Sequence, residues 1–144
     1  MSGQNHSGAQ RLIGSWRHIG STVNGQPRPG QGAHPRGIIM YDAHGHMACQ
    51  VAPDRVVTRA GDKPTGEEAL AALDGHIAYF GTYSVDEEKK TVTYNIVAST
   101  YPNAEGTSQT RTIDKLTADE FVNTNRGAAR DGPAAAANYY VRAK

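Results

Sequence analysis

Two side chains near the middle of the chain have the types and spacing that a proton-transfer site would need. His76 lies beside the apolar stripe of a predicted helix, and Tyr83 follows that helix closely. An imidazole can act as a general acid or base, and a phenol can donate a proton to a developing oxyanion. We therefore predict His76 and Tyr83 as catalytic residues. The alternative is that His76 only forms a hydrogen bond where the helix contacts the rest of the fold.

His18 is the second histidine of interest. In a strand over residues 15–23 it shares a face with Trp16, Gly20 and Thr22, because alternate side chains of a strand point the same way. If Trp16 points inward, His18 lines the floor of a pocket. If it does not, His18 is an exposed strand residue.

His44 and His46 have the His-x-His spacing that places two imidazoles on one side of a strand, as metal sites require. A cupin-type site would also need a glutamate shortly afterwards, and residues 47–54 contain none. A third convergent ligand is not evident, and the glycine-rich stretches lack the strand and helix that flank a phosphate loop. The sequence therefore predicts no metal site and no cofactor.

Polar and aromatic side chains on predicted strands are candidates for ligand binding. Arg111 inside a fold would need an anion, and because few acidic residues occur in the strands, that anion would come from a ligand. The alternative is an outward-facing arginine. Gln50 would line a polar pocket, whereas Met47, Cys49 and Val51 would line an apolar one. The predicted ligand-binding set is His18, Tyr41, Gln50, Tyr94, Asn95 and Arg111. All of these depend on strand parity, since a slip of one residue reverses every face.

The elements that must position these residues are eight strands and one helix. We expect strands at 15–23, 37–41, 46–52, 82–85, 91–99, 107–114, 120–125 and 138–143. The helix begins at a capping box formed by Thr65 and Glu68, carries the stripe Leu70, Leu73, Ile77 and Phe80, and stops at Gly81. Eight strands in meander order predict an all-β, up-and-down antiparallel barrel, with the helix packed on it and room for one small ligand.

Composition limits the remaining possibilities. The chain has 144 residues and a net charge of +1 with scattered basic residues, so we expect one domain over residues 11–144 and no nucleic-acid binding. Residues 1–10 form a polar tail without the apolar core of a secretory signal, and no run is long enough to span a bilayer. Cys49 is the only cysteine. We expect a cytoplasmic protein, a monomer or homodimer with no membrane partner.

Six stretches resemble the lipocalin-like domain family of small cytoplasmic barrels. The longer ones are LIGSWR (12–17), GIIMYDAHGHMACQ (37–50) and DGHIAYFGTYSVD (74–86), and the shorter ones are TVTY (91–94), YPNAEG (101–106) and QTR (109–111). The resemblance implies an eight-stranded barrel with a hydrophobic lumen, a basic residue (here Arg142) packed over Trp16, and in some members a place in a natural-product pathway. The family's strand at 91–99 often carries a histidine and an acidic residue, where this chain has Asn95 and Val97.

Three functions follow as alternatives. The first is a cofactor-independent isomerase, cyclase or lyase acting on a small hydrophobic substrate, which predicts a histidine or tyrosine with a shifted pKa in a roomy pocket. The second is a binding or carrier protein for a small hydrophobic ligand, which predicts an almost wholly apolar lumen. The third is a barrel whose lumen is filled and whose outer surface forms an oligomer, which predicts no cavity above the size of a water molecule and a large exposed apolar patch.

Overall fold

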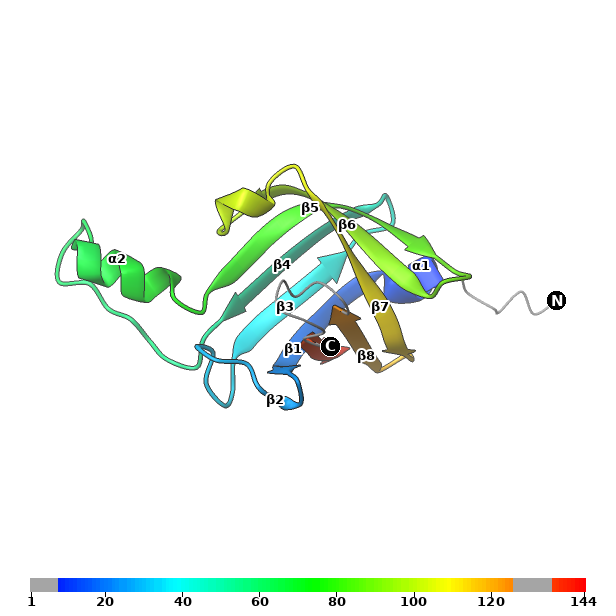
Figure 1. Cartoon of the computed structure of the whole chain (residues 1–144), viewed down its shortest axis with the longest axis horizontal. Helices are drawn as coiled ribbons and strands as arrows, with labels where there is room; N and C mark the ends of the chain where they lie inside the picture. Colours follow the sequence, from blue (N-terminus) through cyan, green and yellow to red (C-terminus); the bar gives the residue numbers. More distant parts are fainter. Residues whose placement is uncertain (1–7, 126–135) are drawn as a thin grey trace.

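A computed structural model describes residues 8–125 and 136–144 and shows a closed antiparallel β-barrel (Figure 1). Each strand pairs with the next around the sheet, and β1 also pairs with β9, which closes it. The eight-stranded barrel is thereby confirmed, and β2 is an additional two-residue strand on β1. The strands are β1 (Gly14–Val23), β2 (Gln26–Pro27), β3 (Arg36–Tyr41), β4 (His46–Ala52), β5 (Ile77–Asp86), β6 (Thr91–Ser99), β7 (Ser108–Leu116), β8 (Glu120–Asn125) and β9 (Ala136–Arg142). The helices are α1 (Gly8–Leu12), α2 (Gly66–Leu73) and the 3-10 turn η1 (Pro102–Ala104).

Strand β4 shows how the sequence pattern selects the inner face. Met47, Cys49 and Val51 are buried in the lumen, whereas Gln50 and the other alternate residues are exposed. Burial of the larger apolar side chains decides the register, because a shift of one residue would move them into solvent. Of the two alternatives for this strand, the apolar face is therefore the one that faces inward.

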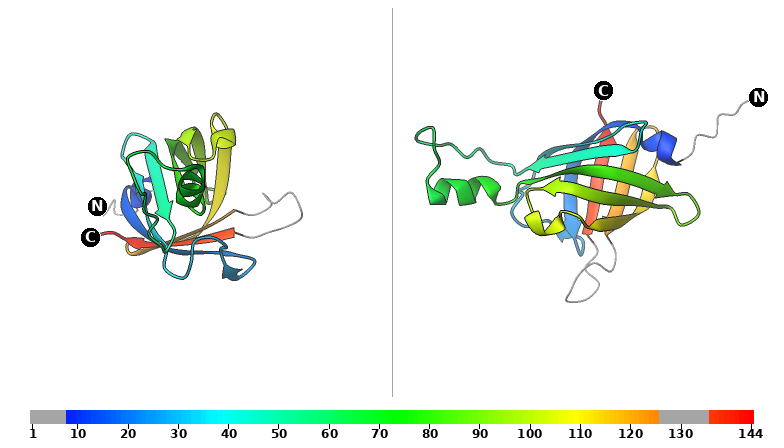
Figure 2. Two further views of the ribbon diagram at one scale, coloured as in Figure 1. Left: turned by 90° about the vertical axis from the view of Figure 1, so that its left-hand side faces the viewer. Right: turned by 90° about the horizontal axis from the view of Figure 1, so that it is seen from above.

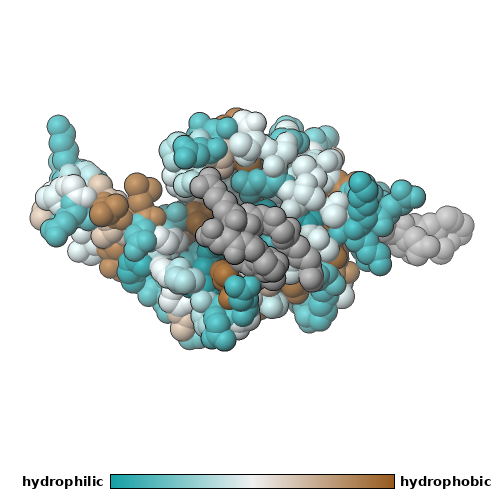
Figure 3. Space-filling view, viewed as in Figure 1, coloured by the Kyte–Doolittle hydropathy of each residue, from teal (hydrophilic) through white to brown (hydrophobic). Residues whose placement is uncertain are grey.

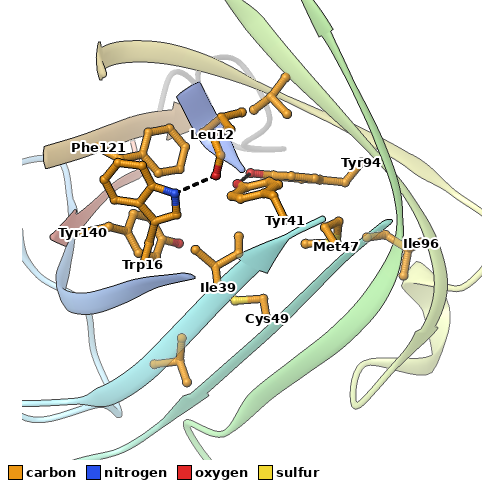
Figure 4. Packing of buried hydrophobic residues seen from close by; sticks show 12 residues of the cluster. Leu12, Trp16, Ile39, Tyr41, Met47, Cys49, Tyr94, Ile96, Phe121 and Tyr140 are labelled. Carbon is orange, nitrogen blue, oxygen red and sulfur yellow. Dashed lines mark hydrogen bonds between the residues drawn. The ribbon is translucent and has the colours of Figure 1, made fainter. Parts of the chain in front are cut away.

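One end of the barrel is filled by aromatic side chains (Figure 4). Trp16 is fully buried, lies 5.6 Å from the ring of Phe121, and donates a 2.9 Å hydrogen bond from Nε1 to the carbonyl oxygen of Leu12 in α1. The guanidinium of Arg142 lies 3.8 Å from the Trp16 ring centroid, as the family resemblance implied. It also donates hydrogen bonds to the carbonyl oxygens of Ile13 and Arg11. These contacts tie the last strand to the first turn of the chain.

The helix is shorter than predicted, and Phe80 is not part of it. The capping box of Thr65 and Glu68 is present. However, α2 ends at Leu73, with Asp74 as its C-cap, and Gly75 follows at a φ of 76°. A positive φ suits glycine just after a helix, so Gly75 is the stop that we had placed at Gly81.

Helix α2 also does not pack on the barrel, contrary to our expectation. It projects beyond the barrel end opposite α1 (Figure 2), none of its residues is buried, and Leu70 is 71% exposed. The predicted stripe included Ile77 and Phe80, which belong to β5, so too few apolar residues remain on the helix to hold it against the sheet. We call the projecting helix α2 the arm. Arg55 fixes the C-terminal end of this arm by donating hydrogen bonds to the carbonyl oxygens of Ala71 and Asp74. Apolar residues consequently gather on the surface around this arm (Figure 3).

The predicted tail of residues 1–10 overlaps the first helix of the described chain. Helix α1 begins at Gly8, whose backbone N–H donates to both carboxylate oxygens of Glu87 at 2.9 and 2.7 Å. Residues 1–7, and most of the loop expected between β8 and β9, lie outside the described residues. Within the described part of the chain, no helix combines the length and apolar character needed to cross a membrane.

Glycine is required at position 81 because of a β-bulge, and not because a helix ends there. The register between β5 and β6 shifts between Phe80 and Gly81, and a Cβ atom at Gly81 would overlap the carbonyl oxygen of Asn95. We expect Gly81→Ala to lower the free energy of unfolding by roughly 3 kcal/mol or more, as measured by urea denaturation. Gly20→Ala is the matched control, because Gly20 lies beside the bulge of β1 with nothing within 4 Å of its Cβ position. Equal effects of the two changes would contradict this explanation.

Arg142 should contribute to stability through both its cation–π contact and its hydrogen bonds. We expect Arg142→Met to lower the free energy of unfolding by about 3 kcal/mol and to alter the fluorescence of Trp16, the only tryptophan. Arg17→Met, which removes an exposed arginine of β1, should have little effect. A loss in Arg142→Met no larger than that in Arg17→Met would show that the contact is not stabilising.

Candidate ligand-binding and active site

A cavity of about 490 Å³ lies at the end of the barrel from which α2 projects, and Leu73 and His76 are among its lining residues. Its lining differs between the two halves of the sheet. Strands β4, β5 and β6 supply a mainly apolar wall, namely Cys49, Val51, Ile77, Tyr79 and Ile96. Strands β7, β9 and β1, with the loop after β2, supply a polar wall, namely His18, Ser21, Arg28, Gln31, Arg111 and Asn138. The cavity is therefore amphipathic.

A bulge in β1 brings His18 and Ser21 onto the same face. Residues three apart in a regular strand point to opposite sides, but the register of β1 against β9 shifts between His18 and Gly20. The extra residue, Ile19, lies outside, and it reverses the parity of the residues that follow. As a result His18 Nε2 lies 2.8 Å from Ser21 Oγ, and both side chains line the cavity.

A chain of hydrogen bonds fixes the tautomer of His18. The Ser21 hydroxyl donates to Asn138 Oδ1 at 2.7 Å, and Asn138 Nδ2 donates to Asn123 Oδ1 at 2.8 Å. Since a hydroxyl has one proton, Ser21 can only accept from His18, so the histidine proton is on Nε2. Nδ1 then carries the free lone pair. It is buried and has no hydrogen-bond partner within the described residues.

The protein environment keeps His18 uncharged. Burial, and after it the positive charge of Arg28, lower the pKa of His18 from 6.5 to about 4. The imidazole edge also packs against the ring of Tyr140, with the centroids 5.3 Å apart. A neutral imidazole with an unpaired Nδ1 is a hydrogen-bond acceptor or a base.

Gln31 carries a second buried polar atom without a partner among the described residues. Its side chain is 3% exposed and lines the cavity, yet its Oε1 has no hydrogen-bond partner in the part of the chain that the structure describes. A buried carbonyl oxygen without a donor costs free energy, so such atoms require an explanation. His18 and Gln31, which both line the cavity, therefore each carry one buried polar atom without a partner among the described residues.

Arg111 lies deep in the cavity on β7. Its guanidinium is 5.9 Å from the centroid of the Tyr94 ring and donates one 2.8 Å hydrogen bond to Gln109 Oε1. Its positive charge also reaches Cys49, Tyr79 and Tyr140, because it partly opposes the rise that burial imposes on the pKa of each. Of the two alternatives for Arg111, the inward orientation is observed.

The structure does not bring His76 and Tyr83 together. Tyr83 lies seven residues further along, mostly in extended β5, which corresponds to roughly 23 Å. Its hydroxyl donates a 2.7 Å hydrogen bond to the carbonyl oxygen of Asp42 at the aromatic end of the barrel. His76 lines the cavity mouth, with Nε2 3.0 Å from Gln50 Nε2 on the outside of β4. The predicted pair therefore cannot act on one small molecule.

The other predicted residues are distributed over the fold. Tyr41 and Tyr94 are buried in the aromatic end, where their hydroxyls are hydrogen-bonded to each other (Figure 4), and burial raises the pKa of both. Asn95 faces outward and accepts a hydrogen bond from Ser108. With Gln50 also outside, only His18 and Arg111 of the predicted ligand-binding set line the cavity.

Sequence reasoning missed several polar residues of the cavity lining, among them Ser21, Arg28, Gln31 and Asn138. Ser21 was assigned to the wrong face because no sequence signal marks the bulge at Ile19. Arg28 and Gln31 are in the proline-rich loop, where periodicity gives no orientation. Asn138 opens the predicted last strand, and the alternation in that strand places it on the same face as Tyr140, which also lines the cavity. That alternation was the one available signal.

The His-x-His pair has a simple explanation. His46 Nδ1 lies 3.0 Å from Asp42 Oδ2 in the exposed turn between β3 and β4. In the described ranges, no three histidine, cysteine or acidic residues come close enough to hold a metal ion.

An eight-stranded antiparallel barrel with a cavity at one end is an architecture that can hold one small ligand. The chain belongs to the lipocalin-like domain family, whose model matches residues 13–138. Among solved structures it is similar to a redesigned beta barrel, with 12% identity and a TM-score of 0.50 over 96% of this chain and 100% of that one. This likeness shows the fold alone. A search of curated proteins gave no match.

The low pKa of His18 predicts a specific pH dependence. Because the pKa is about 4 in the folded state and 6.5 as its ordinary value, the unfolded chain binds more protons between these values. The contribution of neutral His18 to stability is therefore complete above pH 6.5 and is lost as the pH falls towards 4. Urea denaturation should show a larger loss between pH 7 and pH 5 for the native chain than for His18→Gln. An NMR titration of His18 with a midpoint near 6.5 would contradict this.

Proposed function

We propose that the protein is a cofactor-independent enzyme that binds a small, largely apolar molecule in the barrel lumen and transfers a proton on it. The reaction class is an isomerisation, cyclisation or elimination. The observation that carries the proposal is the tautomer of His18, a residue of the cavity lining, which leaves Nδ1 without a hydrogen-bond partner among the described residues. In this proposal His18 replaces His76 and Tyr83 as the acid–base residue.

The hydrogen-bond chain that begins at His18 supports this function, because its donors and acceptors are arranged so that His18 donates from Nε2 and leaves Nδ1 free to accept a proton. If Nδ1 accepts a proton from a substrate carbon or hydroxyl, the imidazolium that forms keeps its Nε2–H bond to Ser21. The chain through Asn138 to Asn123 then holds the ring in position during the transfer. A base that is already oriented lowers the barrier without further reorganisation. The positive charge at Arg111 is placed to stabilise negative charge on the substrate.

The three alternatives from the sequence are unequally supported. A cavity of about 490 Å³ argues against a filled structural barrel. The polar wall argues against a carrier with a wholly apolar lumen. The pKa of His18, lowered to about 4 beside the cavity, supports the enzyme alternative, which predicts a histidine or tyrosine with a shifted pKa. The carrier stays as the second candidate, because the apolar wall of β4, β5 and β6 would bind a hydrophobic ligand without any chemistry.

Two probes test the proposal. N-phenyl-1-naphthylamine, a neutral dye, reports binding in the lumen by fluorescence. The lumen-filling variant Ala104→Trp should weaken dye binding by about tenfold or more, because Ala104 lines the cavity. 5-Nitrobenzisoxazole reports a base, since removal of its ring C–H proton breaks the N–O bond and releases a coloured phenolate.

We expect the native chain to accelerate this elimination at least tenfold over His18→Gln. The rate should rise with pH around 4 and then level off, since His18 must be neutral to accept the proton. His76→Gln is the matched control and should retain the rate. If the dye binds but the elimination rate does not differ between the native chain and His18→Gln, the enzyme hypothesis is refuted and the carrier hypothesis is favoured. Absence of dye binding would refute both.

A further inference from the structure

The polar wall of the cavity carries two positive charges that no acidic side chain among the described lining residues balances. Arg28 and Arg111 both line it, and none of its described lining residues is an aspartate or glutamate. Neither guanidinium forms an ion pair with a residue in 8–125 or 136–144, where the ion pairs are those of Asp42, Asp74 and Glu120. A charged group withdrawn from water without a partner is unfavourable.

Arg111 is the better placed of the two to bind a ligand. It is half-buried, it lies over the Tyr94 ring, and Gln109 accepts only one of its hydrogen bonds. A guanidinium has five N–H donors in a planar fork that matches a carboxylate or a similar oxyanion. Arg28 lies in the loop at the mouth, close enough to His18 to lower its pKa. Its charge therefore adds to the positive potential of the same wall.

The apolar wall specifies the rest of the ligand. Val51, Ile77 and Ile96 on β4, β5 and β6 offer no charge and face the polar wall across the cavity. A molecule that satisfies both walls has a hydrophobic body and one acidic group. We propose that the ligand of this barrel is a small amphipathic acid, whose anionic group is bound by Arg111 under the additional positive field of Arg28. This inference rests on the proposed function only in that the ligand must enter the lumen.

A matched pair of dyes separates the two proposals. 8-Anilinonaphthalene-1-sulfonate is N-phenyl-1-naphthylamine with one added sulfonate, so the ratio of their dissociation constants measures recognition of the anion alone. We expect the native chain to prefer the anionic dye, and Arg111→Met to reduce that preference about tenfold, as one charge-assisted hydrogen bond implies. Binding of the neutral dye should change less than about threefold. Arg111→Lys should retain part of the preference.

Three further variants complete the test. Arg28→Met should reduce the preference by a smaller factor that added salt diminishes, because the loop at the mouth is open to solvent. Arg17→Met removes the same charge from the outer face of β1 and should leave the ratio unchanged. Arg111→Gln is a second variant that removes the charge, and its fold is checked by circular dichroism. It keeps the test valid if Arg111→Met misfolds. A ratio insensitive to Arg111 or equally sensitive to Arg17 overturns the inference while lumen binding stands, whereas failure of both dyes to bind overturns the proposed function.

Discussion

The pairing of β1 with β9 is the interaction on which both ends of this molecule depend. At one end it sets Trp16 opposite Arg142, so that the cation–π contact closes the aromatic core. At the other end it sets Ser21 opposite Asn138, which builds the hydrogen-bond chain to His18. Without this pairing the sheet would have two open edges, and neither the core nor the cavity would have a complete wall. Stability and the candidate site are therefore consequences of the same closing register.

The two ends of the barrel differ in whether their buried polar atoms have hydrogen-bond partners. The aromatic end removes apolar surface from water and pairs its polar atoms: Trp16 with the carbonyl oxygen of Leu12, and Tyr41 with Tyr94. The open end keeps two buried polar atoms, Gln31 Oε1 and His18 Nδ1, that have no partner in residues 8–125 and 136–144. Each such atom costs about 1–3 kcal/mol, which the packed end can offset. A packed end thus allows the other end to keep polar groups ready for a ligand.

The sequence was sufficient for the fold and insufficient for the site. Alternation in β4 and the turn residues around it predicted β3 and β4 correctly, because burial of one face gives a strong periodic signal. The helix end was wrong because Leu73, Ile77 and Phe80 continue a helical spacing into a strand. Gly75 was the better stop signal.

The site residues depended on parity, and one bulge at Ile19 changed the parity of Ser21 relative to His18. A bulge arises from the register between two distant strands, so a local pattern cannot report it. The same limit affected the loop residues Arg28 and Gln31, since nothing periodic fixes where a loop side chain points. The residue types were nevertheless informative. Because few acidic residues occur in the predicted strands, Arg111 indicated an anionic ligand before the orientation of its side chain was known.

The charges of the polar wall and the protonation state of His18 are coupled. Arg28 helps to keep the imidazole neutral, and a ligand anion at this wall would offset part of that positive field. The bound state would then favour a protonated His18 more than the empty state does. An acidic ligand would therefore raise the pKa of His18, the residue that would accept a proton from the ligand in the proposed reaction. In the proposed arrangement the acidic group of the ligand would contribute to binding and would also raise the pKa of the proposed base, without any additional residue from the protein.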